Sequence, residues 1–382
     1  MIPNMSLSGE RFTVVYRIQA DDQIEARARA EALCLEQTVE CPSALLPSGS
    51  VAEAMVGRIE DLRCSSHDAC TATISFAVET IGAEFTQFLN VLFGNSSLKP
   101  GLRVESLSLP KTVSRLFKGP RFGPSGLRAI TGVARRPLVC TALKPLGLPA
   151  TALAEMAYRF AWGGIDLIKD DHGLADQTVA PFAERLARCA EAVARANQET
   201  GGRCLYLPNV TAPFDHVLPR ARAARAAGAG GLLVAPGLVG WETLRRLAED
   251  DSIGLPILCH PAFLGGFAVN PNSGLSPYVL FGQLPRLAGA DASIYPHWGG
   301  RFSFSTNDCR AIVAGARVDM GSVRPLMPAP GGGMGFDRLP DMVEVYGSDV
   351  ILLIGGALQQ RGPDLTANAR YFREKIDTWE TR

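Results

Sequence analysis

The feature that most constrains this chain is a strand-then-helix pattern that repeats eight times between Pro137 and the last residue. Each repeat has a short apolar run followed by an amphipathic stretch typical of a helix, such as residues 181–200 or 364–376. The runs are continuous rather than alternating in polarity, which indicates strands buried on both faces of a parallel sheet. Eight such units predict a (β/α)8 TIM barrel. The runs are LVCTALKP, GIDLIKDD, CLYLPNVT, GGLLVAP, PILCHPA, ASIYPHW, RPLMPAPGG and VILLIGGA.

The residues before the barrel predict a smaller N-terminal α+β domain of the ferredoxin-like kind. We expect strands at about 11–20, 50–62, 70–80 and 102–110, and helices over about 21–38 and 84–98. The segment Phe117–Arg136 is dense in Gly, Pro and Arg, so we interpret it as a linker or a lid. The predicted fold class is α/β, with an N-terminal domain at 1–118 and the barrel at 119–382.

Composition narrows the classes of function. Lys and Arg number 38 and Asp and Glu also 38, and this neutral balance argues against a nucleic-acid partner. No apolar run approaches the ~18 residues that span a bilayer, and the first residues lack a secretory signal pattern. The 9 cysteines show no paired spacing, which favours reduced thiols over a disulfide framework. We therefore expect a cytoplasmic protein with no membrane partner.

The active site of such a barrel forms at the C-terminal ends of its strands. Three of the 5 histidines fall at these positions. So do two of the six lysines of a chain whose 38 basic residues are otherwise arginines. A lone histidine there is more often structural than catalytic, but the coincidence of all these residues indicates an active site. The residues at the strand ends are Lys144, Lys169, Asp170, Asp171, His172, Asn209, His260, His297, Gly331–Gly333 and Gly355–Gly356.

Each of these groups suggests a kind of chemistry. The glycine clusters end the seventh and eighth strands, where barrels commonly bind phosphate through backbone N–H groups, although either cluster alone could be a tight turn. Lys144 and Lys169 could act as a general base, as a Schiff-base nucleophile, or as simple partners of a phosphate. The pair Asp170-Asp171 suggests a Mg²⁺ site, or else a solvated turn.

These motifs resemble the large subunit of ribulose-bisphosphate carboxylase/oxygenase (RuBisCO) and its RuBisCO-like, form IV relatives. GGIDLIKDDHG is similar to the GG(L/I)DxxKDDE signature of that family, and TALKPLGL is similar to its TxKPKLGL strand. The motifs FxGP, HPA, YPHWGG, PAPGGG and IGGA follow in the order of the family, and LCLEQTVE and FGNSS extend the resemblance into the N-terminal domain.

The resemblance implies a role for each matching residue. Lys144 would abstract or shuttle a proton. Lys169 would be carbamylated by CO2 and would bind Mg²⁺ together with Asp171, and His172 stands at the third ligand position. The substrate would contact catalytic His260 and His297, and also Asn209. Its phosphate would lie against Gly332, Gly333, Gly355 and Gly356. Glu36 and Asn95 match positions that reach the barrel of a partner subunit, so a homodimer with a shared site is implied.

Departures from the family pattern argue against CO2 fixation. His172 replaces a ligand glutamate, so either the metal site is altered or this histidine does other work. Leu146 replaces the second lysine of KPK, and Pro261 replaces an arginine that would bind one of two phosphates. The loop after His297 lacks the lysine that would stabilise an added carboxylate, and Gly331 replaces a serine. With one phosphate site retained, the pattern predicts a substrate with a single phosphate.

The hypothesis for the reaction is metal-assisted enolisation of a sugar monophosphate. We expect an isomerase or tautomerase acting on a substrate like 5-methylthioribulose 1-phosphate, because Leu146, Phe263 and Trp298 could accommodate a thioether. The alternative is a decarboxylase or transcarboxylase of a 3-oxo sugar-acid phosphate such as 3-oxo-isoapionate 4-phosphate. A Schiff-base aldolase and a catalytically silent sensor of phosphorylated sugars remain as other hypotheses.

Overall fold

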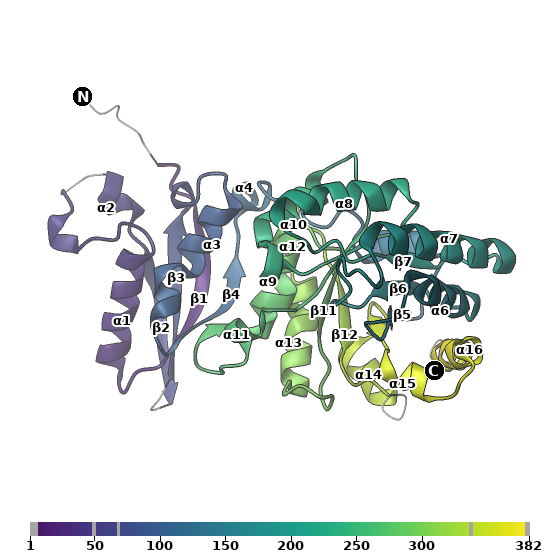
Figure 1. The fold of residues 1–382 in the computed structure, drawn as a ribbon. Coiled ribbons are helices and arrows are strands. Elements are labelled where there is room, and N and C mark those ends of the chain that lie inside the picture. The colour runs from purple at the N-terminus through teal and green to yellow at the C-terminus, as the bar shows by residue number, and fades with distance from the viewer. Residues whose placement is uncertain (1–6, 48–50, 67–68, 336–338, 379–382) are drawn as a thin grey trace.

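The computed structural model describes residues 7–47, 51–66, 69–335 and 339–378 of the 382-residue chain. An N-terminal sheet domain lies beside a barrel of parallel strands surrounded by helices (Figure 1). The N-terminal domain contains β1 (Arg11–Ile18), α1 (Gln23–Glu36), α2 (Val51–Met55), β2 (Arg58–Ser66), β3 (Ala69–Ala77), α3 (Phe85–Phe93) and β4 (Leu102–Ser108). Short 3-10 turns lie at Ser43–Leu45, Val78–Thr80 and Asn95–Leu98, and α4 (Lys111–Ser114) follows β4.

The N-terminal sheet is built on β1, which pairs antiparallel with both β3 and β4. Alternate residues of β1, including Phe12 and Tyr16, are buried, and they share a core with Leu33 of α1 and Phe88 of α3. The expectation of a strand from about residue 50 is wrong at its start, because residues 51–55 form α2. Their sequence, VAEAM, is rich in good helix formers.

A fifth strand of this sheet comes from the barrel part of the chain. β10 (Gly274–Leu275) pairs parallel with β4 at the sheet edge. The carbonyl of Pro271 accepts hydrogen bonds from Arg17 and Arg103, at 3.2 and 3.0 Å. The sheet order is therefore β10-β4-β1-β3-β2.

All eight predicted apolar runs form barrel strands, so the expected (β/α)8 architecture is confirmed. The strands form two arcs, β13-β5-β6-β7 and β12-β11-β9-β8. A parallel bridge between Asn209 and Leu233 joins β7 to β8, and β12 packs beside β13 at the other seam. The strands are β5 (Leu138–Leu143), β6 (Leu167–Asp170), β7 (Leu205–Leu207), β8 (Leu232–Val234), β9 (Ile257–Cys259), β11 (Ala292–Pro296), β12 (Met327–Gly331) and β13 (Ile351–Leu353).

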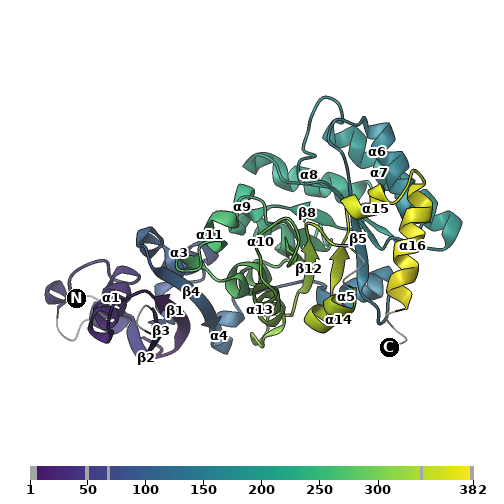
Figure 2. The same cartoon turned by 90° about the horizontal axis from the view of Figure 1, so that it is seen from below.

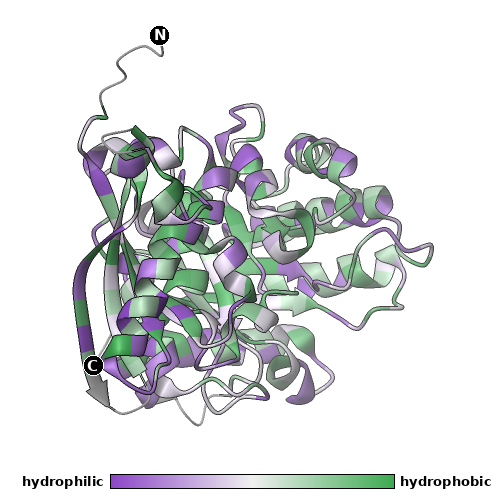
Figure 3. Cartoon of the chain, turned by 90° about the vertical axis from the view of Figure 1, so that its left-hand side faces the viewer, coloured by the Kyte–Doolittle hydropathy of each residue, from purple (hydrophilic) through white to green (hydrophobic). Residues whose placement is uncertain are grey.

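Helices surround the strands, as the view from below shows (Figure 2). Apolar segments gather in the interior and hydrophilic ones on the outer helix faces (Figure 3). One apolar cluster fills the inside of the barrel, and a larger one lies between strands and helices. The helices are α6 (Ala150–Trp162), α7 (Phe182–Thr200), α8 (Phe214–Ala226), α9 (Pro236–Val239), α10 (Trp241–Glu249), α11 (Gly265–Ala268), a π-helix at Tyr278–Gln283, α12 (Leu284–Leu287), α13 (Thr306–Arg317), α14 (Leu339–Tyr346), α15 (Gly356–Gln360) and α16 (Leu365–Asp377).

The segment expected to be a linker or lid contains a helix that lies at the opposite end of the barrel from the predicted site. This helix, α5 (Gly123–Thr131), contributes Leu127 to the apolar cluster inside the barrel. The buried carboxylate of Asp291, just before β11, accepts hydrogen bonds from the backbone N–H groups of Phe122 and Gly123 at 2.6 and 2.9 Å. Since these contacts involve the starts of strands, α5 forms the floor of the barrel and cannot close over its mouth.

One cysteine pair corrects the expectation of reduced thiols. Cys64 and Cys70 are directly paired across β2 and β3 and form a disulfide. Their spacing of six residues did not resemble a disulfide pattern, because it is the antiparallel register of β2 and β3 that brings them together. The other seven cysteines are free, and six of these are buried. No helix in the described part of the chain is long and apolar enough to cross a membrane.

Candidate active site

A cavity of about 950 Å³ opens at the C-terminal ends of the barrel strands. It brings together most of the residues that the sequence placed at strand ends. Both strand-end lysines, one aspartate and three histidines line its wall. From the predicted set, the lining residues are Lys144, Lys169, Asp171, His172, His260, His297, Gly331–Gly333, Gly355 and Gly356.

Lys144 and Asp171 form an ion pair in this cavity. Lys144 follows β5 and Asp171 follows the neighbouring β6, and Nζ lies 3.2 Å from Oδ1. Nδ1 of His172 lies 3.6 Å from the same oxygen. Burial would raise the pKa of Asp171, but the hydrogen bond from His172 and the charges of Lys169 and Lys144 outweigh it and hold this pKa well below its usual value. Asp171 is therefore an ionised carboxylate at neutral pH.

Lys169 is the most buried lysine of the site, with 2% of its surface exposed. Its Nζ donates a hydrogen bond to the backbone carbonyl of Asp170 at 3.1 Å. Burial lowers the pKa of Lys169, because desolvation disfavours the ammonium form. A larger fraction of neutral amine follows, and neutral amine is the form that reacts with CO2.

The adjacent Asp170 is turned away from the cavity into the barrel wall. Its carboxylate accepts hydrogen bonds from Arg185 Nε at 3.0 Å, Tyr206 Oη at 2.8 Å and the backbone N–H of Asn209 at 3.0 Å. Asp170 and Arg185 are both fully buried. The pair Asp170-Asp171 is thus divided, because successive strand residues face opposite sides. Only Asp171 is available to a ligand in the cavity.

The sequence interpretation missed Arg185 and Tyr206. A signal for Arg185 was present, since it lies among the apolar residues of α7 that face the strands. Asn209 is also occupied, because its side-chain amide donates to the carbonyls of His172 and Leu174 at 3.1 and 3.0 Å. It holds the loop that carries His172, and it is not among the cavity-lining residues. Its contact with substrate stays a prediction.

His260 and His297 approach the cavity with different surroundings. Nδ1 of His260 accepts the backbone N–H of Ala262 at 3.1 Å, and its ring stacks on His172 with centroids 4.5 Å apart. Burial, assisted by the nearby Lys169, lowers the pKa of His260 far below its ordinary value, so the ring is neutral. His297 is buried, and its Nδ1 lies 2.9 Å from the hydroxyl of Tyr346.

Two glycine segments flank one side of the mouth, after β12 and β13. Gly332 and Gly333 have φ angles of +86° and +115°, which L side chains rarely adopt. A Cβ on Gly333 would lie 2.9 Å from the Cα of Gly300, so no side chain fits there. A Cβ on Gly356 would meet nothing within 4 Å, which leaves backbone exposed to the cavity. Both segments can therefore present backbone N–H groups to an anion.

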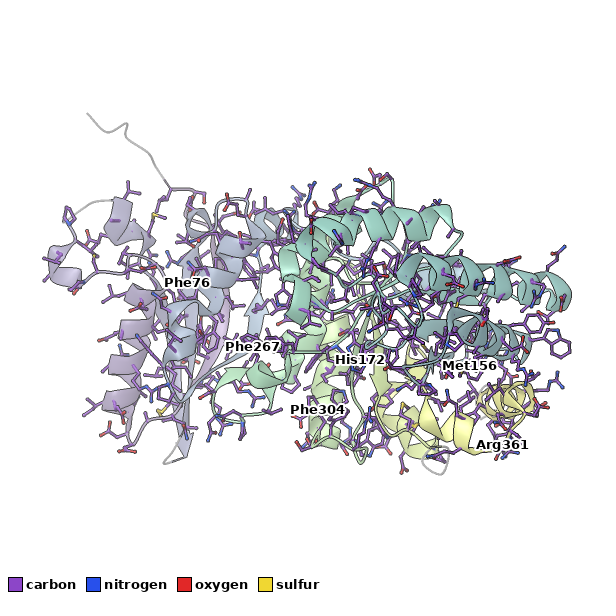
Figure 4. The ribbon with its side chains drawn as sticks, in the orientation of Figure 1. Phe76, Met156, His172, Phe267, Phe304 and Arg361 are labelled. Carbon is purple, nitrogen blue, oxygen red and sulfur yellow. A yellow bond between two sulfur atoms is a disulfide. The ribbon has the colours of Figure 1, made fainter. Side chains whose placement is uncertain are left out.

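Another part of the lining, after β9, is apolar and carries Pro261 and Phe263. Phe263 is 79% exposed and has φ of +67°, an uncommon conformation for a bulky residue. In Figure 4, His172 lies at the centre of the barrel, and Phe304, another cavity-lining residue, lies near it. Two other residues were expected to accommodate a thioether. Trp298 packs on His297, with ring centroids 4.0 Å apart. Leu146 is half-exposed and is not among the cavity-lining residues.

Glu36 and Asn95 lie together in the N-terminal domain. Nδ2 of Asn95 donates to Oε1 of Glu36 at 3.2 Å, and Lys99 lies 3.7 Å from the other oxygen. Neither residue lines the cavity of its own chain, and α1, which ends at Glu36, lies on the side of the sheet domain away from the barrel (Figure 1).

A divalent metal fits this site only if the amine of Lys169 is converted to a carbamate. The described residues contain no group of three or more His, Cys, Asp or Glu side chains that could hold a metal ion. Beside the amine of Lys169, the cavity instead offers one carboxylate, Asp171, with the imidazole of His172 next to it. A carbamate on Lys169 would add oxygen donors of the kind that Mg²⁺ prefers. These residues therefore fit Mg²⁺ on the condition that Lys169 is carbamylated.

Comparison with known proteins decides the family. Residues 125–380 match the family described as ribulose bisphosphate carboxylase large chain, catalytic domain. The chain belongs to this family. The RuBisCO-like chain is 40% identical to ribulose bisphosphate carboxylase-like protein 1 of Rhodopseudomonas palustris, over 96% of this chain and 98% of that protein.

Another relative carries the name of an enzyme. It is 5-methylthioribulose-1-phosphate isomerase of Rhodospirillum rubrum, with 38% identity over 95% of each chain. Among solved structures, a Rubisco-like protein from Rhodopseudomonas palustris superposes with a TM-score of 0.88 and 39% identity, covering 97% of this RuBisCO-like chain and 99% of the other. The suspected membership of the RuBisCO-like proteins is confirmed.

Proposed function

We propose that this RuBisCO-like chain enolises a sugar monophosphate and acts as an isomerase on a substrate like 5-methylthioribulose 1-phosphate. The observation that carries the proposal is the polarity of the cavity. Glycine backbone suited to phosphate lines the cavity after β12 and β13, the Lys144–Asp171 pair is inside, and the apolar Pro261 and Phe263 line it after β9. A substrate with phosphate at one end and a thioether at the other matches this arrangement. The similarity to the Rhodospirillum rubrum isomerase supports the same assignment.

Proton abstraction is assigned to Lys144. Its Nζ shares the cavity with Asp171, and an ideal Cβ on Gly355 would lie 3.9 Å from it, so the amine is beside the proposed phosphate end. Lys169 in its carbamylated form would hold Mg²⁺ together with Asp171, and His172 is the proposed third ligand. When bound, the metal supplies polarisation of a substrate carbonyl and its neighbouring hydroxyl. Gly332, Gly333, Gly355 and Gly356 bind the phosphate, and His260 and His297 contact the reacting oxygens.

The proposal includes a homodimer in which Glu36 and Asn95 complete the cavity of the partner subunit. Their distance from the cavity of their own chain supports this assignment. We also propose a cytoplasmic location. The seven free cysteines favour this location, whereas the Cys64–Cys70 disulfide argues against it.

The test is NMR in D2O with Mg²⁺ and bicarbonate. Offered 5-methylthioribulose 1-phosphate, the protein is expected to introduce deuterium at carbon and to form a new isomer. Lys144→Met should abolish both changes, whereas Lys111→Met, a control at an exposed lysine in the N-terminal part, should leave them intact. Isomer formation that survives Lys144→Met would contradict the assigned base.

A second substrate distinguishes the isomerase from the alternative function, a decarboxylase. Loss of a carboxylate carbon from 3-oxo-isoapionate 4-phosphate, with no change in the first substrate, would make the protein a decarboxylase. Covalent trapping of either substrate by borohydride would instead indicate a Schiff-base aldolase. Binding without deuterium exchange in both tubes would leave only a sensor of phosphorylated sugars.

A further inference from the structure

One charged residue of the cavity has no part in the proposed reaction. Arg301, in the loop between β11 and α13, is exposed and lines the cavity. Its guanidinium forms no ion pair with any residue that the structure describes. The two lysines of the cavity differ in this respect, because Lys144 is paired with Asp171 at 3.2 Å and Lys169 is buried. Arg301 therefore offers the cavity a positive charge that no described carboxylate compensates.

The backbone of Arg301 is joined to the glycine segment that follows β12. Its N–H donates a hydrogen bond to the carbonyl of Gly332 at 3.1 Å. An ideal Cβ on the preceding residue, Gly300, would overlap the same carbonyl oxygen, so the two backbones approach each other closely. The loop that carries Arg301 is thus held against the segment that the proposed function assigns to phosphate.

The ring of Phe302 brings the side chain of Arg301 to the same place. Cζ of Arg301 lies 5.2 Å from the centroid of this ring, within the range of a cation–π contact. An ideal Cβ on Gly332 would lie 3.0 Å from Cε2 of the ring, so the ring fills the space beside this glycine. Phe302 therefore packs against the glycine on which the phosphate is proposed to lie and against the guanidinium.

A phosphate in this cavity needs a cation. A phosphate monoester carries a charge of about −1.5 to −2 at pH 7, and backbone N–H groups bring only partial positive charge to it. Lys144 lies near Gly355, but an amine that acts as a base must be neutral when it takes the proton. A guanidinium stays charged and donates two parallel hydrogen bonds to phosphate oxygens. Arg301 has the chemistry and the position for this role.

We infer that the guanidinium of Arg301 binds the phosphate of the substrate, and that Phe302 is a positioning residue that holds it beside Gly332. The inference rests on the proposed function, because it assigns a residue to the phosphate end of the same cavity. Gly332 and Gly333 contact the phosphate oxygens through the backbone, and Arg301 compensates their charge. The site thereby selects the phosphate dianion over a neutral group or a carboxylate.

The first test is binding of inorganic phosphate, followed by 31P NMR. Arg301→Met should weaken the binding about tenfold or more, since it removes charged hydrogen bonds at nearly constant side-chain length. Arg301→Lys, which keeps the charge, should recover part of the loss. The matched control is Arg310→Met. Arg310 is an exposed arginine of α13 that is paired with Glu344 at 3.0 Å and is not among the cavity-lining residues, so its removal should leave phosphate binding unchanged.

A double-mutant cycle tests the positioning role of Phe302. Phe302→Leu should weaken phosphate binding about threefold in the wild type, the size of an exposed cation–π contact, and Phe302→Trp should preserve binding. In the Arg301→Met background, Phe302→Leu should cause no further loss. An equal loss in both backgrounds would mean that Phe302 does not act through Arg301, and would overturn this part of the inference.

A carboxylate probe tests the selectivity for phosphate. Acetate should bind the wild type and Arg301→Met equally weakly. Acetate binding that depends on Arg301, together with phosphate binding that does not, would assign this residue to a carboxylate and overturn the inference. A wild type that binds no phosphate, or Arg301→Met with unchanged phosphate binding, would overturn it as well.

Kinetics connect the phosphate contact to turnover. Arg301→Met should raise the KM for 5-methylthioribulose 1-phosphate about tenfold or more and change kcat less, because the contact is made equally with substrate and transition state. The phosphate titration needs no turnover. A protein that binds phosphate through Arg301 but turns over no sugar phosphate would therefore refute the proposed function and leave this inference in place.

Discussion

Lowering the pH from 7 to 5 is expected to stabilise the barrel through one buried carboxylate, that of Asp291. This side chain is 1% exposed and accepts backbone N–H groups from Phe122, Gly123 and Ile257, so it joins the floor helix α5 to the strands above it. Two effects on its pKa oppose each other. Burial raises the pKa of Asp291, and the three hydrogen bonds lower it, with the balance at about 6.

The sign and size of the effect follow from this value. A carboxyl with a pKa of about 6 in the folded state and 3.8 in the unfolded chain binds more protons when folded between these pH values. Protonation therefore favours the folded state, by about 3 kcal/mol in full, since one pKa unit is worth about 1.4 kcal/mol. About 1.4 kcal/mol of this appears between pH 7 and pH 5.

The assay is urea unfolding at pH 7, 6 and 5 for the wild type and for Asp291→Asn, which cannot titrate. Other carboxylates and histidines titrate equally in both proteins, so the difference between their free energies of unfolding isolates Asp291. That difference should shift in favour of the wild type as the pH falls. A constant difference would mean that the three hydrogen bonds balance burial, and a shift in favour of the asparagine variant would mean that they outweigh it. Either result would refute this reasoning.

Three further predictions concern the cavity and its wall. Phe263→Ala should raise the KM for 5-methylthioribulose 1-phosphate about tenfold and leave the KM for an analogue without the methylthio group unchanged, measured by steady-state kinetics. The Glu36→Ala and Lys144→Met variants, each inactive alone, should regain about a quarter of wild-type activity when they are mixed and refolded, because about half of the random dimers are mixed and each mixed dimer has one intact site of two. No recovery of activity from such mixtures would count against a shared site. Arg185→Met should destabilise the protein by about 3–5 kcal/mol in chemical unfolding, since it leaves the buried Asp170 without its cation, and adding Asp170→Asn should recover much of the loss.

The barrel was predictable because its pattern repeats. Each apolar run needed only to resemble a buried strand, and eight in sequence left few alternative folds. The floor helix α5 was not predictable in the same way, because Gly, Pro and Arg dominate the segment around it. What makes it a helix in the barrel floor is the burial of Leu127 and the three hydrogen bonds to Asp291, which is distant in sequence.

The membership of the site was predictable, but its hydrogen bonds were not. Position at strand ends placed Lys144, Asp171 and the histidines around one cavity. No local pattern showed that Asp170 faces the wall, or that Tyr346 supports His297 from a helix 49 residues away in sequence. Such partners depend on tertiary packing. The roles of the site residues, and the domain boundary at residue 118, stay predictions.

The parallel pairing of β10 with β4 makes the N-terminal sheet an anchor for one wall of the cavity. Only a short stretch of chain separates His260 and Phe263 from β10, and the hydroxyl of Ser276 just beyond it is bonded to the carbonyl of Glu105 at 2.8 Å. A rotation of the N-terminal domain therefore pulls directly on the backbone that carries this histidine and this phenylalanine. A partner subunit bound to the N-terminal domain would therefore act on the shape of this cavity through the pairing of β10 with β4, as well as through any residue it places in the cavity.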